Sequence, residues 1–143
     1  MEIPGRLFSH KTTLKKVVLC YIILMFLIIK YMDTIVMKLH PEPFDAIKSG
    51  KKKIELRLYD EKRKNINLGD IIEFKKEPEQ TETIKTKVVA LLRYNNFSNL
   101  FDDFGSGMFG DKSKNELLDG VARFYSEDQQ KENGVLGIKI ELV

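Results

Sequence analysis

Residues 50–60 read GKKKIELRLYD, and this stretch carries the most specific pattern in the 143-residue chain. A glycine, a lysine, a glutamate and an arginine follow one another as Gly-x-Lys-x-x-Glu-x-Arg, at Gly50, Lys52, Glu55 and Arg57. Apolar and polar residues alternate here, which is the period of a β-strand with one buried face. We therefore expect a half-buried strand over residues 52–59. Its inner face would carry Ile54, Leu56 and Leu58, and its outer face Lys53, Glu55, Arg57 and Tyr59.

The flanking segments predict short helices and further strands. Pro43 suits a first helical position and Gly50 a helix stop, so residues 43–49 should form a short helix with Phe44 and Ile47 facing the core. Ser113 and Glu116 form a capping box, which opens a second helix. The predicted helices cover 43–49, 97–104 and 114 to about 125 (apolar stripe Leu117, Val121 and Phe124), with one more turn from Ser126 to Asn133-Gly134.

Strands dominate the rest of the chain. Gly69-Asp70 is a turn signal before an apolar strand, and Glu77 to Gln80 reads as a loop. We expect strands over 71–74, 81–94 (one long strand or a pair) and 136–142. Because strands and helices do not alternate regularly, the pattern favours an α+β domain with a small mixed or closed sheet.

The net charge of +3 conceals an uneven distribution. Residues 1–32 carry five basic groups against one acid, whereas residues 33–143 carry 19 against 20, a net of −1. Within that body, residues 48–64 hold eight basic groups and three acids, a net of +5. The body is therefore no general polyanion binder, and any affinity for nucleic acid must come from this local patch.

The first thirty residues pose a separate question. Residues 17–29 are 13 uninterrupted apolar or aromatic residues between lysines, shorter than the ~20 that normally span a bilayer. A secretory signal would need a small-residue cleavage site, which the residues after Lys30 do not offer. A signal anchor over residues 14–31 would fit the flanking lysines. The interpretation we favour is a natural start at Met32 or Met37, with residues 1–31 outside a cytoplasmic working protein; if they are retained, the protein would be membrane-anchored.

Several chemistries find little support. One Cys and two His exclude a disulfide framework and a Cys/His zinc site within one chain, so we expect no metal and no cofactor. Residues 105–110 match G-x-G-x-x-G literally, but no strand pattern precedes them and two aspartates lie beside them. They are expected to form a loop in which Met108 and Phe109 pack inward. His40 has no identifiable partner and is expected to be structural.

Residues 34–143 resemble the ASCH domain family of the PUA-like superfamily. The resemblance rests on Leu39, Pro41 and Pro43-Phe44 before a short helix, on the Gly50–Arg57 motif, on Gly69-Asp70, and on Tyr125, Gly134 and the closing strand. It implies a small β-barrel with peripheral short helices, formed by residues 32–143, after an N-terminal extension over residues 1–31. It also implies a cleft lined by the motif residues.

RNA or a nucleoside or nucleotide is the ligand that the resemblance implies. Lysines suit phosphates, and a strand-borne glutamate can accept from exocyclic amino groups. The residues expected to bind are Lys38, Lys51, Lys52, Lys53, Glu55, Arg57 and Tyr94.

Two alternatives stay open. Some small bacterial ASCH proteins are amidohydrolases acting on acetylated cytidine; their catalytic lysine corresponds to Lys52, but Glu55 stands where they have a threonine. Lys52 and Glu55 would be the catalytic residues, with Asp111 or Glu116 nearest to the family's glutamate. Alternatively, the basic segment is a solvated edge with one surface ion pair, which would suit a protein-interaction domain with an acidic partner.

Overall fold

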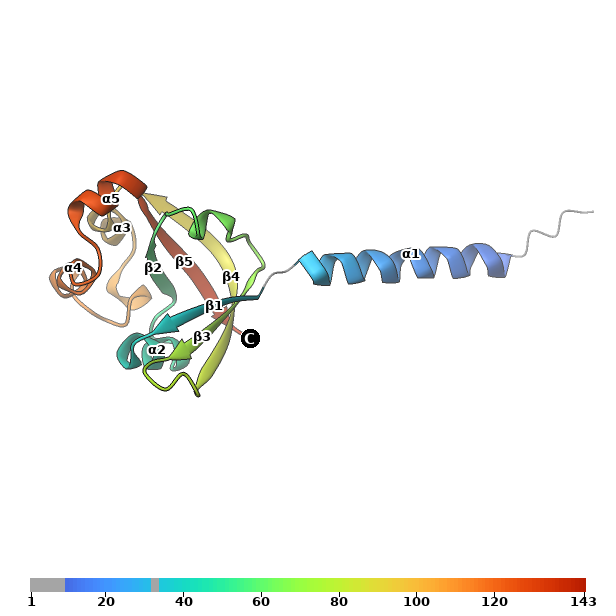
Figure 1. Cartoon of the computed structure of the whole chain (residues 1–143), viewed down its shortest axis with the longest axis horizontal. Coiled ribbons are helices and arrows are strands. Elements are labelled where there is room, and N and C mark those ends of the chain that lie inside the picture. Colours follow the sequence, from blue (N-terminus) through green and yellow to red (C-terminus); the bar gives the residue numbers. More distant parts are fainter. Residues whose placement is uncertain (1–9, 32–33) are drawn as a thin grey trace, which may run out of the picture. The chain divides into compact units, whose positions relative to one another are not determined.

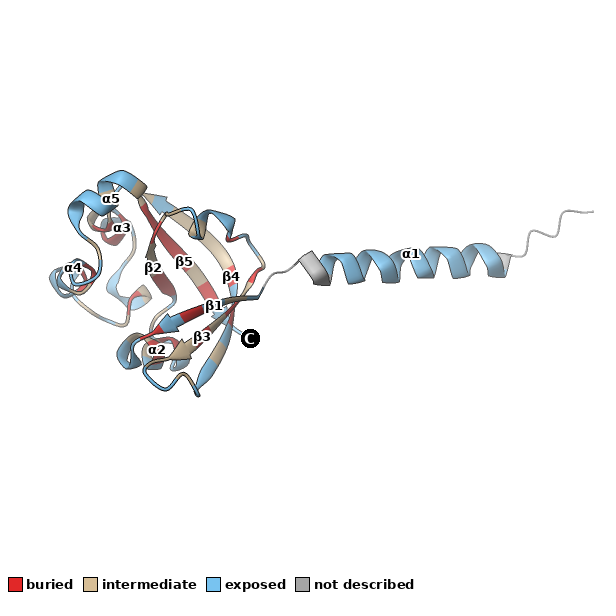
Figure 2. Cartoon of the chain, viewed as in Figure 1, coloured by how far each residue is buried: buried red, intermediate tan, exposed pale blue. Residues whose placement is uncertain are grey.

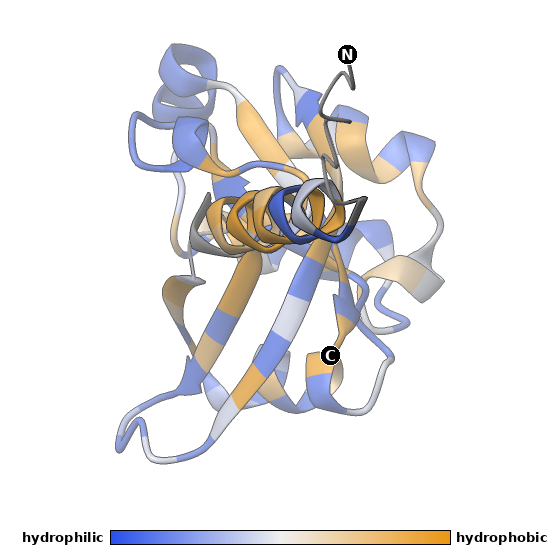
Figure 3. Ribbon diagram, turned by 90° about the vertical axis from the view of Figure 1, so that its right-hand side faces the viewer, coloured by the Kyte–Doolittle hydropathy of each residue, from blue (hydrophilic) through white to orange (hydrophobic). Residues whose placement is uncertain are grey.

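The computed structural model of the chain describes residues 10–31 and 34–143, which fall into two compact units, Met1–Asp33 and Thr34–Val143. The expected boundary and the alternative start at residue 32 lie outside the described residues. In the first unit, helix α1 spans His10–Tyr31, and Figure 3 shows that most of it is hydrophobic. Among the described residues, no helix is long and apolar enough to cross a membrane.

The second unit is built on one curved five-stranded sheet. Its strands are β1 (Thr34–Leu39), β2 (Ile54–Leu58), β3 (Ile71–Lys76), β4 (Thr83–Tyr94) and β5 (Val135–Leu142). They lie in the order β1-β3-β4-β5-β2, with β1 parallel to β3 and every other pair antiparallel. The sheet is a half-barrel with β1 and β2 as its edge strands (Figure 1).

Short helices surround the sheet. Helix α2 (Pro41–Lys48) connects β1 to β2, while α3 (Phe97–Asp103), α4 (Lys114–Ala122) and α5 (Glu127–Asn133) gather beside β2 and the start of β5 (Figure 1). Two 3₁₀ turns, Arg63–Asn65 and Ser106–Met108, complete the elements. Capping boxes begin α4 at Ser113 and α5 at Ser126.

Two apolar cores occupy the two faces of the sheet. The first fills the concave side with Phe44 and Ile47 of α2 and with Ile72, Phe74 and Ile138 of the strands. The second joins the other face to α3 and α4 through residues such as Ile54, Phe97, Leu100 and Val135. Buried residues consequently run along the middle of the strands (Figure 2). Gly137 leaves room for α3, because a Cβ there would lie 2.9 Å from Leu100 Cδ1 and 3.1 Å from Ile54 Cγ2.

Most of the predicted elements are confirmed, with boundary shifts of a few residues. The α+β class, the three predicted helices, the loop after β3, the Gly69-Asp70 turn and the long β4 are all present. The predicted single turn after Ser126 is a seven-residue helix, α5. Strand β1 was not predicted, although Met37 and Leu39 are buried in it and Lys38 between them is exposed.

Two burial predictions are wrong. Strand β2 is covered on both faces, because Glu55 is buried at 3% exposure together with Ile54 and Leu58. The face expected to meet solvent belongs to the concave side of the half-barrel, where Tyr59 packs against the first core. Phe124 was expected in the apolar stripe of the helix after Ser113, but α4 ends at Ala122 and the Phe124 side chain is 58% exposed.

Candidate functional site

Three residues of the motif form one ion network, which we call the ionic site: Lys52, Glu55 and Arg57. Lys52 Nζ donates to Glu55 Oε2 at 2.6 Å, and Arg57 Nη2 lies 3.1 Å from Glu55 Oε1. The side chains of Lys52, Glu55 and Arg57 are 12%, 4% and 16% exposed. One carboxylate therefore bridges two cations, and the network keeps a net charge of +1. This differs from a solvated edge with one surface ion pair.

The backbone around Gly50 brings Lys52 next to Glu55. Gly50 has a φ of +76°, a left-handed conformation that glycine adopts readily, and it turns the chain away from α2. Lys52 N then donates to Ala46 O, and Lys53 N donates to Met108 O. Because both backbone groups are held, Lys52 stands just before β2 and its side chain folds over the strand to Glu55.

Burial and neighbouring charges act in opposite directions on the carboxyl of Glu55. Burial acts to raise its pKa, but the charges of Lys52 and Arg57 and the hydrogen bond from Lys52 outweigh burial and hold the pKa below its ordinary value. Burial likewise acts to lower the pKa of Arg57, whereas Glu55 and Tyr125 raise it, and the net direction is upward. At neutral pH the site therefore holds an ionised glutamate and a charged arginine.

Arg57 also connects the two edge strands of the half-barrel. Its Nη2 donates to the backbone oxygen of Lys38 at 3.2 Å, which ties β2 to β1 where they share no ladder of strand hydrogen bonds. Its Nε is buried and has no hydrogen-bond partner among the described residues. The guanidinium therefore lies between the two edge strands, and its one unused donor is buried.

The junction between α4 and α5 lies beside Arg57. Tyr125 lies beside the Arg57 guanidinium and contributes to its raised pKa. The Phe124 ring rests on the ring of His40 at 5.4 Å, and His40 Nδ1 lies 3.4 Å from a carboxylate oxygen of Glu77. Sequence reasoning missed Phe124 and His40 as neighbours of the motif. The end of α4 was placed three residues too late, and a capping box marks only where a helix begins.

Further acidic and basic side chains lie near Lys52. Glu42 pairs with Lys112, and its pKa is held below the ordinary value by Lys112 first and also by Arg123 and Lys52. Glu42 at the start of α2, Arg123 at the end of α4 and Lys52 are thus within electrostatic reach of one another.

The remaining lysines of the predicted site do not belong to the ion network. The side chains of Lys38, Lys51 and Lys53 are exposed, on β1 and on the segment before β2, and no ion-pair partner is found for them among the described residues. Lys51 and Lys53 flank Lys52 in the chain, and the backbone oxygen of Lys38 accepts from Arg57, so the three lysines stand on segments next to the ionic site.

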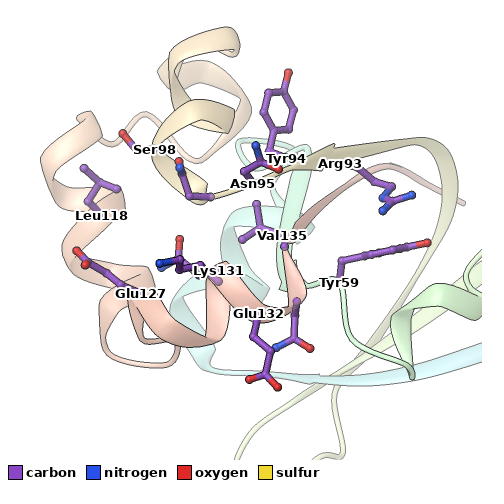
Figure 4. A pocket seen from close by; sticks show the side chains of 14 residues that line it. Tyr59, Arg93, Tyr94, Asn95, Ser98, Leu118, Glu127, Lys131, Glu132 and Val135 are labelled. Atoms are coloured by element: carbon purple, nitrogen blue, oxygen red, sulfur yellow. The ribbon is translucent and has the colours of Figure 1, made fainter.

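Tyr94 is not brought to the ionic site. Its hydroxyl donates to Asp103 Oδ2, its ring packs edge-on against Phe104, and it lines a separate groove of about 990 Å³ that we call the β4–α5 groove. Figure 4 shows side chains of this groove, which include Tyr59, Arg93, Tyr94, Asn95, Glu127 and Lys131. Arg93 stacks over the Tyr59 ring at 3.9 Å from its centroid.

Other expected residues have structural surroundings. Glu116 accepts from Ser113 N at 2.8 Å in the capping box of α4, which occupies its carboxylate. Asp111 is exposed in the loop after Phe109. The loop over 105–110 pairs with the segment before β2 through Lys52 and Phe109, and Phe109 is buried against Phe101. The inward packing expected of Phe109 is confirmed.

The domain is thus a small α+β half-barrel with short helices around it, and Arg57 of an ion network of one carboxylate and two cations ties its edge strands together. The family model of the ASCH domain matches residues 37–143, and the chain belongs to the ASCH domain family. The resemblance that the motif indicated is thereby confirmed.

The solved structures agree with this assignment. The chain is similar to the crystal structure of hypothetical protein PH0355, with 38% identity and a TM-score of 0.69 over 78% of this chain and 100% of the other. It is similar to protein PF0455 from Pyrococcus furiosus, with 39% identity and a TM-score of 0.63 over 78% and 98%. An ASCH domain from Lactobacillus crispatus shares the fold at 15% identity, with a TM-score of 0.55 over 79% and 81%. A search of curated proteins finds no match.

Proposed function

We propose that this protein binds RNA, or a nucleotide derived from it, at the ionic site of Lys52, Glu55 and Arg57. The observation that carries the proposal is the ion network itself, in which two cations share one buried carboxylate and leave a net positive charge where Arg57 ties β2 to β1. A phosphate oxygen is an anion that the Nη groups of a guanidinium and a lysine ammonium would bind together.

The cost of the network supports a role beyond folding. Three charges with at most 16% exposure have lost most of their hydration, and a buried ion pair rarely stabilises a fold more than apolar residues of the same size would. The network also carries one more positive than negative charge. A binding anion would balance that charge where water is largely excluded and the attraction is strong.

The exposed lysines would extend contact along a polynucleotide. Lys38, Lys51 and Lys53 are exposed on the segments that carry the ionic site, so they would act as point charges toward successive phosphates. Each phosphate neutralised on a single strand contributes a slope of about −0.7 to log affinity against log salt. Glu55, as an ionised acceptor, would favour bases that present an amino group. The cytoplasm, where such ligands are abundant, is the compartment that we propose.

Anisotropy titrations of a short labelled single-stranded RNA with the full-length chain, at several salt concentrations, test this. Lys51→Ala/Lys53→Ala should weaken binding and make the salt slope shallower by up to about 1.4, for two lost phosphate contacts. The matched control is Lys85→Ala/Lys87→Ala, which removes two exposed lysines spaced identically on β4, and it should bind like the wild type.

The ionic site itself is tested with variants that remove its charges and keep polar side chains. Lys52→Gln/Arg57→Gln should weaken binding to every sequence, while Glu55→Gln should change the base preference. Thermal unfolding establishes which variants are folded at the titration temperature. Equal RNA binding by the wild type and a folded Lys52→Gln/Arg57→Gln variant would overturn the proposal.

Amide hydrolysis of acetylated cytidine is the alternative function, and the geometry supports it less well. Lys52 Nζ is engaged at 2.6 Å by an ionised carboxylate, which pairs with the ammonium form rather than the free amine that a base or nucleophile needs. Glu116, one of the two acids nearest to the family's glutamate, is engaged in a helix cap. Incubation of the full-length chain with acetylated cytidine tests this function, and acetate release that is lost in Lys52→Gln would establish it.

A further inference from the structure

Phe124 stands out among the aromatic residues of the domain. Within residues 34–143, all of which the structure describes, every other Phe and Tyr is buried or half-buried, whereas the Phe124 side chain is 58% exposed. It follows the end of α4, at Ala122, and precedes the cap of α5, at Ser126, so helix ends on both sides fix its backbone. A single exposed apolar residue needs no explanation by itself, and its surroundings decide what it does.

Those surroundings place Phe124 beside the ionic site. The next residue, Tyr125, lies against the Arg57 guanidinium, and Tyr125 is itself held by stacking on Phe97 at 5.6 Å. On the other side the Phe124 ring rests on His40, two residues after the Lys38 carbonyl that accepts from Arg57. Contacts through both β1 and the α4–α5 junction therefore link the Phe124 ring to Arg57.

The ring is supported but not enclosed. His40 lies 5.4 Å from it with the two planes inclined by 31°, and Tyr125 lies 6.4 Å from it. The backbone helix ends and the His40 ring restrict how far Phe124 can swing. A flat apolar surface held in this way, next to a cationic centre, matches the two halves of a nucleotide, the base and the phosphate.

We infer that Phe124 is the stacking surface for an unpaired base of a single-stranded RNA whose adjacent phosphate is held by Arg57 and Lys52. This inference rests on the proposed function. It adds a contact to the face of the base, whereas Lys52 and Arg57 contact the phosphate. Base–aromatic stacking contributes substantially in single-strand binding and tolerates any base, because every base has a π-face. In a duplex the bases are stacked on one another and shielded, so duplex RNA would gain nothing from Phe124.

The absence of tryptophan from the chain gives a direct reporter. In Phe124→Trp the new indole is the sole tryptophan, and stacking of a base on it should quench its fluorescence as single-stranded RNA saturates the site. The control is Leu68→Trp, which puts the sole tryptophan at another exposed apolar position, 67% exposed in the wild type and in the segment before β3. Its emission should not change. An RNA of the same backbone without bases should leave both unquenched.

Affinity supplies the second measurement. Phe124→Leu should lower the affinity for single-stranded RNA by about 5- to 150-fold, the range expected for one stacked base, and leave the salt slope unchanged because no phosphate contact is lost. Phe124→Tyr keeps a ring and should bind like the wild type. This pattern differs from that of Lys51→Ala/Lys53→Ala, which changes the slope.

The outcomes separate this inference from the proposed function. RNA binding without quenching at position 124, or with wild-type affinity in Phe124→Leu, would overturn the stacking role and leave RNA binding intact. No RNA binding by the wild type would overturn both. Equal quenching by the base-free backbone or by an acidic peptide would show that Phe124 reports any anion at Arg57, which also contradicts stacking.

Discussion

The ionic site and the β4–α5 groove are two polar regions next to strand β2. They differ in how far their charged side chains are buried and paired. At the ionic site, Lys52, Glu55 and Arg57 are paired with one another and almost entirely removed from water. The groove has a volume of about 990 Å³, but Arg93 and Lys131 on its lining are exposed and are matched in number by exposed Glu127 and Glu132.

The difference means that, on physical grounds, the volume of a groove alone would not decide where an anion binds. Charges in the groove are hydrated and screened by salt, and they sum to zero. Charges at the ionic site have few water molecules around them and sum to +1, so a bound anion would meet a stronger and less screened attraction. Desolvation and net charge therefore favour the ionic site over the larger groove.

The largest expected effect comes from removing the carboxylate that joins the two cations. Glu55→Ala leaves Lys52 and Arg57 without their shared partner, and the free energy of unfolding should fall by about 3–5 kcal/mol, as for other broken buried ion pairs. Glu127→Ala removes the same charge from the groove and should change stability by no more than about 0.5 kcal/mol. Urea denaturation monitored by circular dichroism measures both.

One result of these two denaturation experiments would contradict the contrast between the ionic site and the groove. If Glu55→Ala and Glu127→Ala destabilise the chain equally, the ion network contributes no more than a surface charge, and the contrast between the two regions is lost. Glu55→Gln, which keeps the size of the side chain and a hydrogen-bond acceptor, should fall between the wild type and Glu55→Ala.

Acid should produce a second, smaller effect with a defined sign. The folded pKa of Glu55 lies below its ordinary value of 4.5, so its ionised form contributes stability that is fully present above the unfolded pKa. That contribution is lost as the pH falls through the folded pKa, when the carboxyl takes up a proton. The difference in unfolding free energy between the wild type and Glu55→Gln should therefore shrink in acid.

Glu42 and Glu116 also have lowered pKa values, so the wild type alone does not isolate Glu55. Both groups remain in Glu55→Gln, and only the difference between the two proteins reports Glu55. Urea midpoints measured from neutral pH down to about one unit below the ordinary glutamate pKa give this difference. A difference that grows as the pH falls would contradict the assigned direction.

Much of the fold could be predicted because local signals determined its elements. Capping boxes at Ser113 and Ser126, the glycine at 69 and the alternation in β5 each act over a few residues and are visible in the sequence. Strand β1 was not predicted because Ile35, Val36 and Met37 are consecutive apolar residues that hide the period of two in the sequence, although burial alternates regularly along the folded strand.

The candidate site was predictable only in part. The spacing of Glu55 and Arg57 put them on one strand face. That this face is buried depends on how β1 and the α4–α5 junction close over it, through Lys38, 19 positions before Arg57, and Tyr125, 68 positions after it. The same closure brings Phe124 to His40, a contact between distant residues that periodicity does not encode.

The smallest expected effect concerns Tyr94, which the sequence placed among the binding residues and the structure places in the groove. Tyr94→Phe removes only the hydroxyl that donates to Asp103, and the Asp103 hydrogen bond is the main cause of the raised pKa of Tyr94. Because Tyr94 touches no member of the ionic site, RNA affinity and its salt slope should match the wild type in anisotropy titrations. A loss of affinity of about tenfold or more, equivalent to about 1.4 kcal/mol of binding free energy, would mean that the groove takes part in binding and that its balanced, hydrated charges do not exclude RNA.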